Sequence, residues 1–203
     1  MSIKGSFFVI LGLVLVAPMV RPDRAACEED HSHHMHSMKK APVRSLVSYE
    51  VPDLTLMNRS GEKVGLRNLL ATDKPVMLNF IFATCNTICP VLSAGFASFQ
   101  DELGAEASMV QLVSITIDPE HDTTMVLKDY SERFGAGPGW HFLTGTRDDI
   151  NKAMKAFDAY ATNKMNHRPL TFIHAPGTEQ WLRIDGLMSS AEYMKEYREL
   201  TRQ

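Results

Sequence analysis

The stretch V-M-L-N-F-I-F-A-T-C-N-T-I-C-P, residues 76–90, places an apolar segment, a loop and a helix start in direct succession. Its first seven residues, 76–82, are almost continuously apolar, which is typical of a strand buried on both faces of a sheet. Cys85 and Cys89 follow this strand, and Pro90 suits the first position of a helix because its missing N–H needs no partner there. The stretch therefore predicts a central strand whose carboxyl end carries two cysteines.

The segments on either side of this stretch alternate between strand and helix patterns. Strands are predicted over residues 54–58, 109–117, 140–144, 170–174 and 179–184. Helices are predicted over residues 90–103, 123–134, 147–158 and 190–202. Asp122, Thr146 and Ser189 stand where N-caps are expected. Such alternation indicates an α/β fold with a central mixed sheet flanked by helices.

The composition of the chain excludes several classes of protein. Hydrophobic residues make up 44% of the 203 residues and charged residues 22%, which are the proportions of a globular protein rather than a disordered one. A formal net charge of -3 provides no basic excess for nucleic-acid phosphates, so we expect no nucleic-acid partner. Three cysteines are too few for a disulfide scaffold.

The N-terminal segment, residues 1–26, has the pattern of an export signal. Lys4 precedes an apolar run over residues 7–20. As a helix this run would span about 21 Å at about 1.5 Å per residue, short of a bilayer core of about 30 Å. We predict a signal peptide, with an uncleaved membrane anchor as the alternative. Either one places the remaining chain outside the cytoplasm.

Residues 27–48 are predicted to form a flexible tether ahead of a folded domain over residues 49–203. The tether has no apolar periodicity and is rich in imidazole and thioether groups, which suit copper. These donors are His31, His33, His34, His36, Met35 and Met38. The tract is either a metal-loading segment or a solvated tail, and Cys27 could belong to it.

The cysteine pair carries the chemistry that the sequence predicts for the domain. Ligands bind at the carboxyl ends of strands in α/β sheets, which is where Cys85 and Cys89 are expected. Because helix N-termini favour anions, we expect the Cys89 thiolate to be stabilised. Two thiols at this spacing can form a disulfide or bind a soft metal; the alternative is a pair of buried structural cysteines.

The segment C-N-T-I-C-P, residues 85–90, resembles the CxxxCP signature of the Sco/SenC copper-delivery proteins. Three further segments, residues 113–124, 139–145 and 166–177, resemble that family in the same order. The resemblance covers about residues 48–200. It implies a thioredoxin-like three-layer fold and attachment to a membrane, here the inner membrane facing the periplasm.

The resemblance also implies a copper site formed by Cys85, Cys89 and His167. Two thiolates and an imidazole suit Cu(I), and Cu(II) could use the same donors with a further ligand. The implied function is a metallochaperone that delivers copper to the dinuclear copper site of a cytochrome c oxidase. The implied partner is the apo copper-site subunit or another copper chaperone. Asp118 and Asp122 match acidic positions of the family, where they could support the site or face a partner. The alternative is that Asp122 caps a helix, which we expect, and that Asp118 shapes a turn.

The main alternative is a thiol–disulfide oxidoreductase in which Cys85 attacks and Cys89 resolves the mixed disulfide, or in which Cys89, as the thiol at the helix end, takes the attacking role instead. A cis bond before Pro169 would favour this alternative. The two functions differ at His167, which copper binding requires and thiol exchange does not. A peroxidase is set aside, because Phe82 stands three residues before Cys85 and Asn86 three before Cys89, where a Thr or Ser is expected.

Overall fold

A computed structural model of the chain describes residues 41–201. The predicted N-terminal signal or anchor, the His/Met tract and Cys27 lie outside the described residues. Within residues 41–201, none of the helices has the length and apolar character required to cross a membrane.

The centre of the domain is one mixed sheet, as the alternating pattern predicts. Within the described chain its strands lie in the order β1-β8-β7-β4-β5-β6-β2-β3. β4 is parallel to β5, which is parallel to β6, whereas β7 is antiparallel to β4. The strands are β1 (Val43–Ser48), β2 (Thr55–Asn58), β3 (Lys63–Gly65), β4 (Val76–Ile81), β5 (Gln111–Thr116), β6 (Trp140–Thr144), β7 (Leu170–His174) and β8 (Gln180–Asp185).

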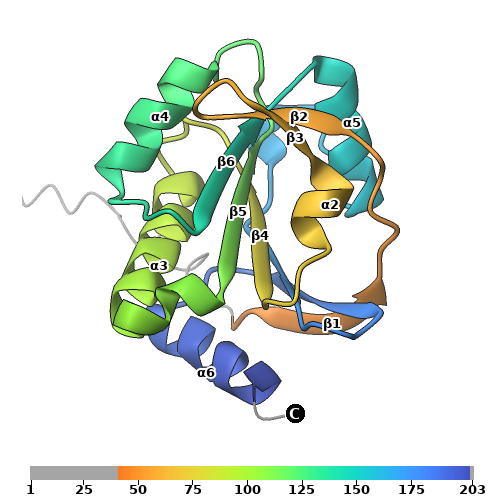
Figure 1. Cartoon of the computed structure of the whole chain (residues 1–203). Coiled ribbons are helices and arrows are strands. Elements are labelled where there is room, and N and C mark those ends of the chain that lie inside the picture. The colour runs from red at the N-terminus through yellow and green to blue at the C-terminus, as the bar shows by residue number, and fades with distance from the viewer. Residues whose placement is uncertain (1–40, 202–203) are drawn as a thin grey trace, which may run out of the picture.

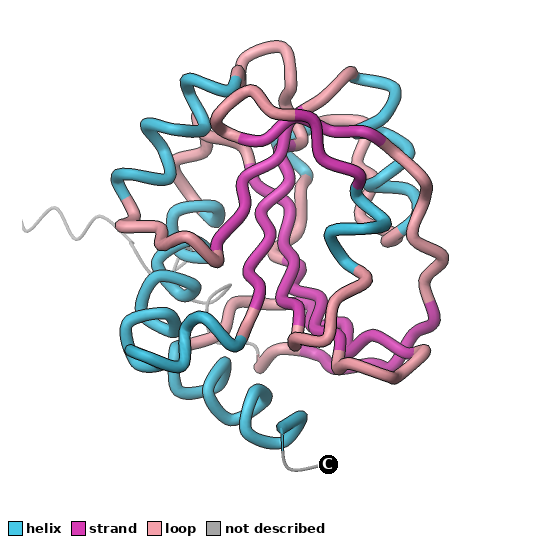
Figure 2. The backbone as a smooth tube through the Cα atoms, viewed as in Figure 1, coloured by secondary structure: helices cyan, strands magenta, loops and turns pink. Residues whose placement is uncertain are grey.

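Helices cover both faces of this sheet and complete the expected three layers. α3, α4 and α6 lie on one side, whereas α2 and α5 lie on the other (Figure 1). Figure 2 shows the strands running through the middle of the molecule between these helices. The helices are α2 (Leu66–Leu70), α3 (Ile88–Leu103), α4 (Thr124–Arg133), α5 (Arg147–Ala156) and α6 (Ser190–Thr201), with 3-10 turns η2 (Gly104–Met109) and η3 (Lys164–Asn166).

β4 is the central strand that the sequence predicts, although it ends one residue earlier, at Ile81. All six of its residues are buried. Successive side chains of a strand point to opposite faces, so β4 contributes to both halves of the core. On one face the Phe80 ring lies 6.0 Å from that of Phe172 on β7. On the other face Phe96 of α3 packs on Trp140 of β6, with ring centroids 5.7 Å apart. Each such buried ring contributes about 1.5–3 kcal/mol.

The first strand, β1, corrects the predicted extent of the tether. Residues 43–48 pair antiparallel with β8 over its whole length instead of remaining flexible. Leu46 is 66% exposed and only Val47 is half-buried, so the strand has no apolar face. It is held by its backbone ladder and by Arg44, whose Nε donates to Glu196 at 2.7 Å. A strand held in this way leaves no periodic apolar pattern to predict it.

The helix starts are partly as predicted. Thr146 caps α5 by accepting from the Asp149 N–H, and Ser189 forms the expected reciprocal bonds with Glu192. The predicted cap of α4 is wrong, because Thr123 and not Asp122 accepts from the Val126 N–H.

The start of α3 also differs from the prediction. Thr87 is its N-cap and Ile88 its first residue, so Pro90 stands at the third helical position rather than the first. Pro90 fits there because the first four N–H groups of a helix have no partner within it. Cys89 consequently lies inside the first turn of the helix.

Candidate metal centre

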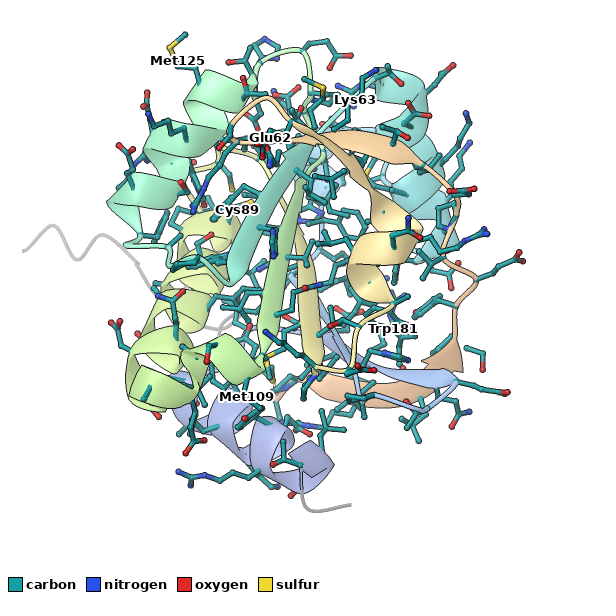
Figure 3. All side chains as sticks on the ribbon, in the orientation of Figure 1. Glu62, Lys63, Cys89, Met109, Met125 and Trp181 are labelled. Carbon is teal, nitrogen blue, oxygen red and sulfur yellow. The ribbon has the colours of Figure 1, made fainter. Side chains whose placement is uncertain are left out.

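The loop between β4 and α3 holds two thiols in different surroundings. The Cys85 N–H donates to the Phe82 carbonyl at 3.1 Å, which turns the chain directly after the strand. The Cys85 Sγ accepts from the Cys89 N–H at 3.5 Å and lies 3.5 Å from the Thr87 hydroxyl. Both cysteines are free thiols, Cys85 half-buried and Cys89 fully buried against the core near the start of α3 (Figure 3).

These surroundings move the pKa values of the two thiols in opposite directions. Burial raises the pKa of Cys85, but hydrogen bonds from Thr87 and from the Cys89 N–H outweigh it, so the pKa lies below its usual value. Burial raises the pKa of Cys89 strongly, and the nearby Cys85 and Asp122 add to the rise. The expectation that the helix end stabilises a Cys89 thiolate is therefore wrong: the helix N–H of Cys89 bonds to the other sulfur, and Cys89 itself is desolvated.

His167 presents an unpaired ring nitrogen. The side chain is 7% exposed, and its Nε2–H donates to the Phe80 carbonyl at 2.8 Å. This bond leaves Nδ1 as the lone-pair nitrogen, and Nδ1 is buried with no hydrogen-bond partner. Burial lowers the pKa of His167, which keeps the ring neutral. A buried neutral imidazole with a free lone pair, oriented through its other nitrogen, has the properties of a metal ligand.

A small pocket of about 80 Å³ brings His167 and the half-buried thiol together. It is lined by Phe82, Cys85, Thr87, Ile88, Lys164, Met165 and His167. Cys89 is not among these residues, but its N–H contacts the Cys85 sulfur. Within residues 41–201, no three His, Cys, Asp or Glu side chains stand ready-made as a metal site. The structure thus brings two of the three predicted ligands to one pocket and leaves the third adjacent to it.

Asp118 and Asp122 have different roles beside this pocket. Asp122 is fully buried, and its Oδ2 accepts from the Ala83 N–H at 2.9 Å and from the Thr116 hydroxyl at 2.6 Å. It ties the cysteine loop to β5 instead of capping a helix. The backbone carbonyl of Asp118 accepts from the Asp122 N–H, so it shapes a turn as predicted, and its carboxylate also binds Lys164 Nζ at 2.5 Å.

Replacing Asp122 with alanine is expected to destabilise the domain by about 1–3 kcal/mol, because the buried Thr116 hydroxyl and the half-buried Ala83 N–H lose their acceptor. Urea unfolding followed by circular dichroism measures this change. Asp122→Asn retains an amide oxygen for that N–H and should cost less, and Asp53→Ala, an exposed site, is the control. An Asp122→Ala protein as stable as the control would contradict the role of Asp122 as the loop anchor.

Three hydroxyl-, amine- or sulfur-bearing residues of this pocket were not predicted from the sequence. Thr87 bonds to Cys85, Lys164 joins the pocket to Asp118, and Met165 lies at its edge. A soft sulfur donor two residues before His167 was a signal that could have pointed to Met165. The bond before Pro169 is trans, and no described peptide bond is cis.

Comparison with known proteins identifies the relatives of this domain. The SCO1/SenC family model matches residues 46–201. The chain belongs to the SCO1/SenC family. A SCO1 protein homolog from Bacillus subtilis is 33% identical over 120 residues, which are 58% of this chain and 61% of the relative. The alignment thus spans about three-fifths of that SCO1/SenC protein.

Solved structures of SCO1/SenC proteins share the fold described above. BsSco, a member of the Sco family of cytochrome c oxidase assembly proteins for which a disulfide switch has been identified, superposes with a TM-score of 0.64 at 26% identity, over 79% of this chain and 98% of BsSco. Copper-bound ScoI from Bradyrhizobium japonicum superposes with a TM-score of 0.62 at 21% identity, over 74% and 98% of the two chains. The family and the thioredoxin-like fold expected from the sequence are therefore confirmed.

Proposed function

We propose that this chain is a copper metallochaperone that binds copper through Cys85, Cys89 and His167. The observation that carries this proposal is the unpaired, buried Nδ1 of His167 in one pocket with the low-pKa thiol of Cys85. Leaving a buried ring nitrogen unpaired costs free energy, which a metal bound at that nitrogen would offset. Membership of the SCO1/SenC family supports the same assignment.

The donor set suits Cu(I) as cargo. Thiolate sulfur and imidazole nitrogen are soft to borderline ligands, and two of these donors already share the pocket. Full coordination requires Cys89 to turn from the core toward the pocket and to release its proton, because only the thiolate binds metal tightly. Copper loading is therefore coupled to a local change at the first turn of α3.

The proposed recipient is the dinuclear copper site of a cytochrome c oxidase. Copper would pass to it by ligand exchange from the pocket at the carboxyl end of β4. The apo copper-site subunit or another copper chaperone would be the partner. Residues 1–26 would export the chain to the periplasm as a cleaved signal or retain it at the inner membrane. The tract from His31 to Met38 would supply copper to the pocket.

A second candidate function is thiol–disulfide exchange by the same cysteine pair. It is favoured by the opposite pKa shifts of the two thiols, which make Cys85 the attacking group and Cys89 the resolving group. In this function the partner would be the oxidised cysteine pair of an oxidase subunit. His167 has no necessary part in it.

Anaerobic Cu(I) titration of the reduced full-length chain against a coloured chelator tests the primary function. The titration uses a chain in which the tract cannot bind copper, hereafter the tract-silenced chain. Its substitutions are His31→Ala, His33→Ala, His34→Ala, His36→Ala, Met35→Leu and Met38→Leu. We expect this chain to hold one copper tightly, and Cys85→Ser with Cys89→Ser to weaken the affinity by about 100-fold or more, beyond the 10–100-fold typical of changes around metal ligands.

Cys27→Ser in the same background is the matched control, since it removes a thiol outside the described domain. It should bind copper as the parent does. If the Cys85/Cys89 double variant competed with the chelator as well as the control, the copper-chaperone function would be wrong.

A further inference from the structure

One side chain at the pocket combines exposure to solvent with a soft donor atom. Met165 is 66% exposed, so ions in solution can reach this side chain. It lines the same pocket as Cys85 and His167. Its thioether is a soft donor, and soft donors select Cu(I).

The local backbone holds Met165 close to His167. Met165 is the central residue of η3, and its N–H donates to Asn163 Oδ1 at 2.9 Å. The His167 N–H donates to the Lys164 carbonyl at 3.2 Å and closes this turn. These bonds fix the backbone at Met165 and at His167, and both residues line the pocket.

The positive charge beside Met165 is neutralised. Lys164 Nζ forms an ion pair with Asp118 at 2.5 Å and lies 5.4 Å from the centre of the Phe82 ring. The carboxylate of Asp118 is itself almost fully buried, so this pairing fixes the lysine at the pocket. A cation that approaches Met165 therefore meets a compensated ammonium group rather than a free one.

Cys89 cannot be the first thiol to meet an incoming ion, because it is fully buried and is not among the residues that line the pocket. The residues with soft to borderline donor atoms that line the pocket at that stage are Cys85, His167 and Met165. We propose that Met165 is an exchangeable third ligand, which holds Cu(I) together with Cys85 and His167 until Cys89 replaces it. This inference rests on the proposed copper-binding function.

In this ligand exchange one bond to copper breaks and one forms, and no electron is transferred. The bond from copper to the Met165 Sδ breaks as the bond to the Cys89 Sγ forms, and the Cys89 thiol releases its proton to solvent. Copper remains Cu(I) throughout. Release follows the reverse order, so the thioether would hold the ion at the surface while a partner's ligands take it.

The first test measures the rates of Cu(I) uptake from a coloured chelator complex, and of release to excess chelator, in the tract-silenced chain. Met165→Leu removes the sulfur and keeps an apolar side chain of similar size. We expect it to slow both steps by about tenfold or more, as loss of a group that positions a metal does. Met125→Leu is the matched control, because Met125 is 69% exposed on α4, away from the pocket (Figure 3).

The second test uses Cys89→Ser, which leaves Met165 as the third ligand permanently. In this background Met165→Leu should weaken Cu(I) affinity by about tenfold or more. X-ray absorption of the copper-loaded proteins should count two sulfur neighbours before the Met165 change and one after it. This count reports on the ligand itself rather than on folding.

The outcomes separate this inference from the function on which it rests. If Met165→Leu matches Met125→Leu in rates, affinity and sulfur count, while Cys85→Ser and His167→Ala still weaken binding, Met165 is not a ligand and the chaperone function stands. If Cys85→Ser and His167→Ala bind copper as tightly as the parent, the copper site itself is wrong and the Met165 exchange is wrong with it.

Discussion

Replacing His167 with alanine is expected to weaken Cu(I) binding by about 100-fold or more, at or beyond the upper end of the 10–100-fold loss seen when the groups around metal ligands are changed. The same change should leave the reduction potential of the Cys85–Cys89 pair close to that of the parent, because the imidazole bonds to the Phe80 carbonyl and not to either sulfur. The pair of measurements separates copper binding from thiol exchange, since only copper binding needs the imidazole.

Two further variants distinguish the loss of a copper ligand from a folding defect. His167→Gln retains an N–H donor for the Phe80 carbonyl and lacks the imidazole, so it should fold as the parent does and still lose copper. His174→Ala is the matched control, because His174 also bonds through Nε2 to a carbonyl and has a buried, unpartnered Nδ1. His174 stacks on Trp181, outside the pocket. Equal copper affinity in the His167→Ala and His174→Ala proteins would contradict the assignment of His167 as a ligand.

Native alkylation with iodoacetamide should modify Cys85 and spare Cys89 almost completely. The thiolate is the reactive form, and each unit of pKa difference changes its population by about tenfold at a pH below both values. The pKa of Cys85 is lowered by its hydrogen bonds, whereas burial raises that of Cys89 and also blocks access to its sulfur. Both effects favour Cys85, so we expect Cys85 to react at least about 100-fold faster than Cys89.

The pH dependence of this reaction has a definite sign. A lowered pKa means that Cys85 is already ionised at a pH where an ordinary cysteine is protonated, so its alkylation rate should level off at a lower pH than that of a cysteine peptide. Tandem mass spectrometry of peptides from Cys27→Ser protein, in which fragmentation locates the label at Cys85 or at Cys89, measures the rates at each site. Unfolding in urea should make both cysteines react alike. Faster native alkylation at Cys89 than at Cys85 would show that Cys89 is the attacking thiol.

Several features of this protein could be predicted from local sequence. The apolar run of β4, the loop with Cys85 and Cys89, and the caps at Thr146 and Ser189 each depend on residues close together in the chain. Strand periodicity and helix capping are physical consequences of near neighbours, so the alternation of strands and helices was sufficient to predict the mixed sheet. The family signature around the cysteines added the expectation of His167.

The tertiary structure decided the strand pairing of β1, the contacts of Asp122, and the ionisation and hydrogen bonding of the proposed ligands. β1 forms because β8 offers a free edge, and its exposed side chains carry no pattern of their own. Asp122 anchors the loop of Cys85 to β5, a contact that its place before a helix did not suggest. The sequence by itself determined the strands and helices around the site and the donor types. Burial raises the pKa of Cys89, so the Cys85 thiol is the one that ionises more readily. The hydrogen bond from His167 to the Phe80 carbonyl, 87 residues away in the chain, leaves Nδ1 as the free nitrogen. Desolvation and hydrogen bonding of this kind depend on residues that only the folded chain brings together.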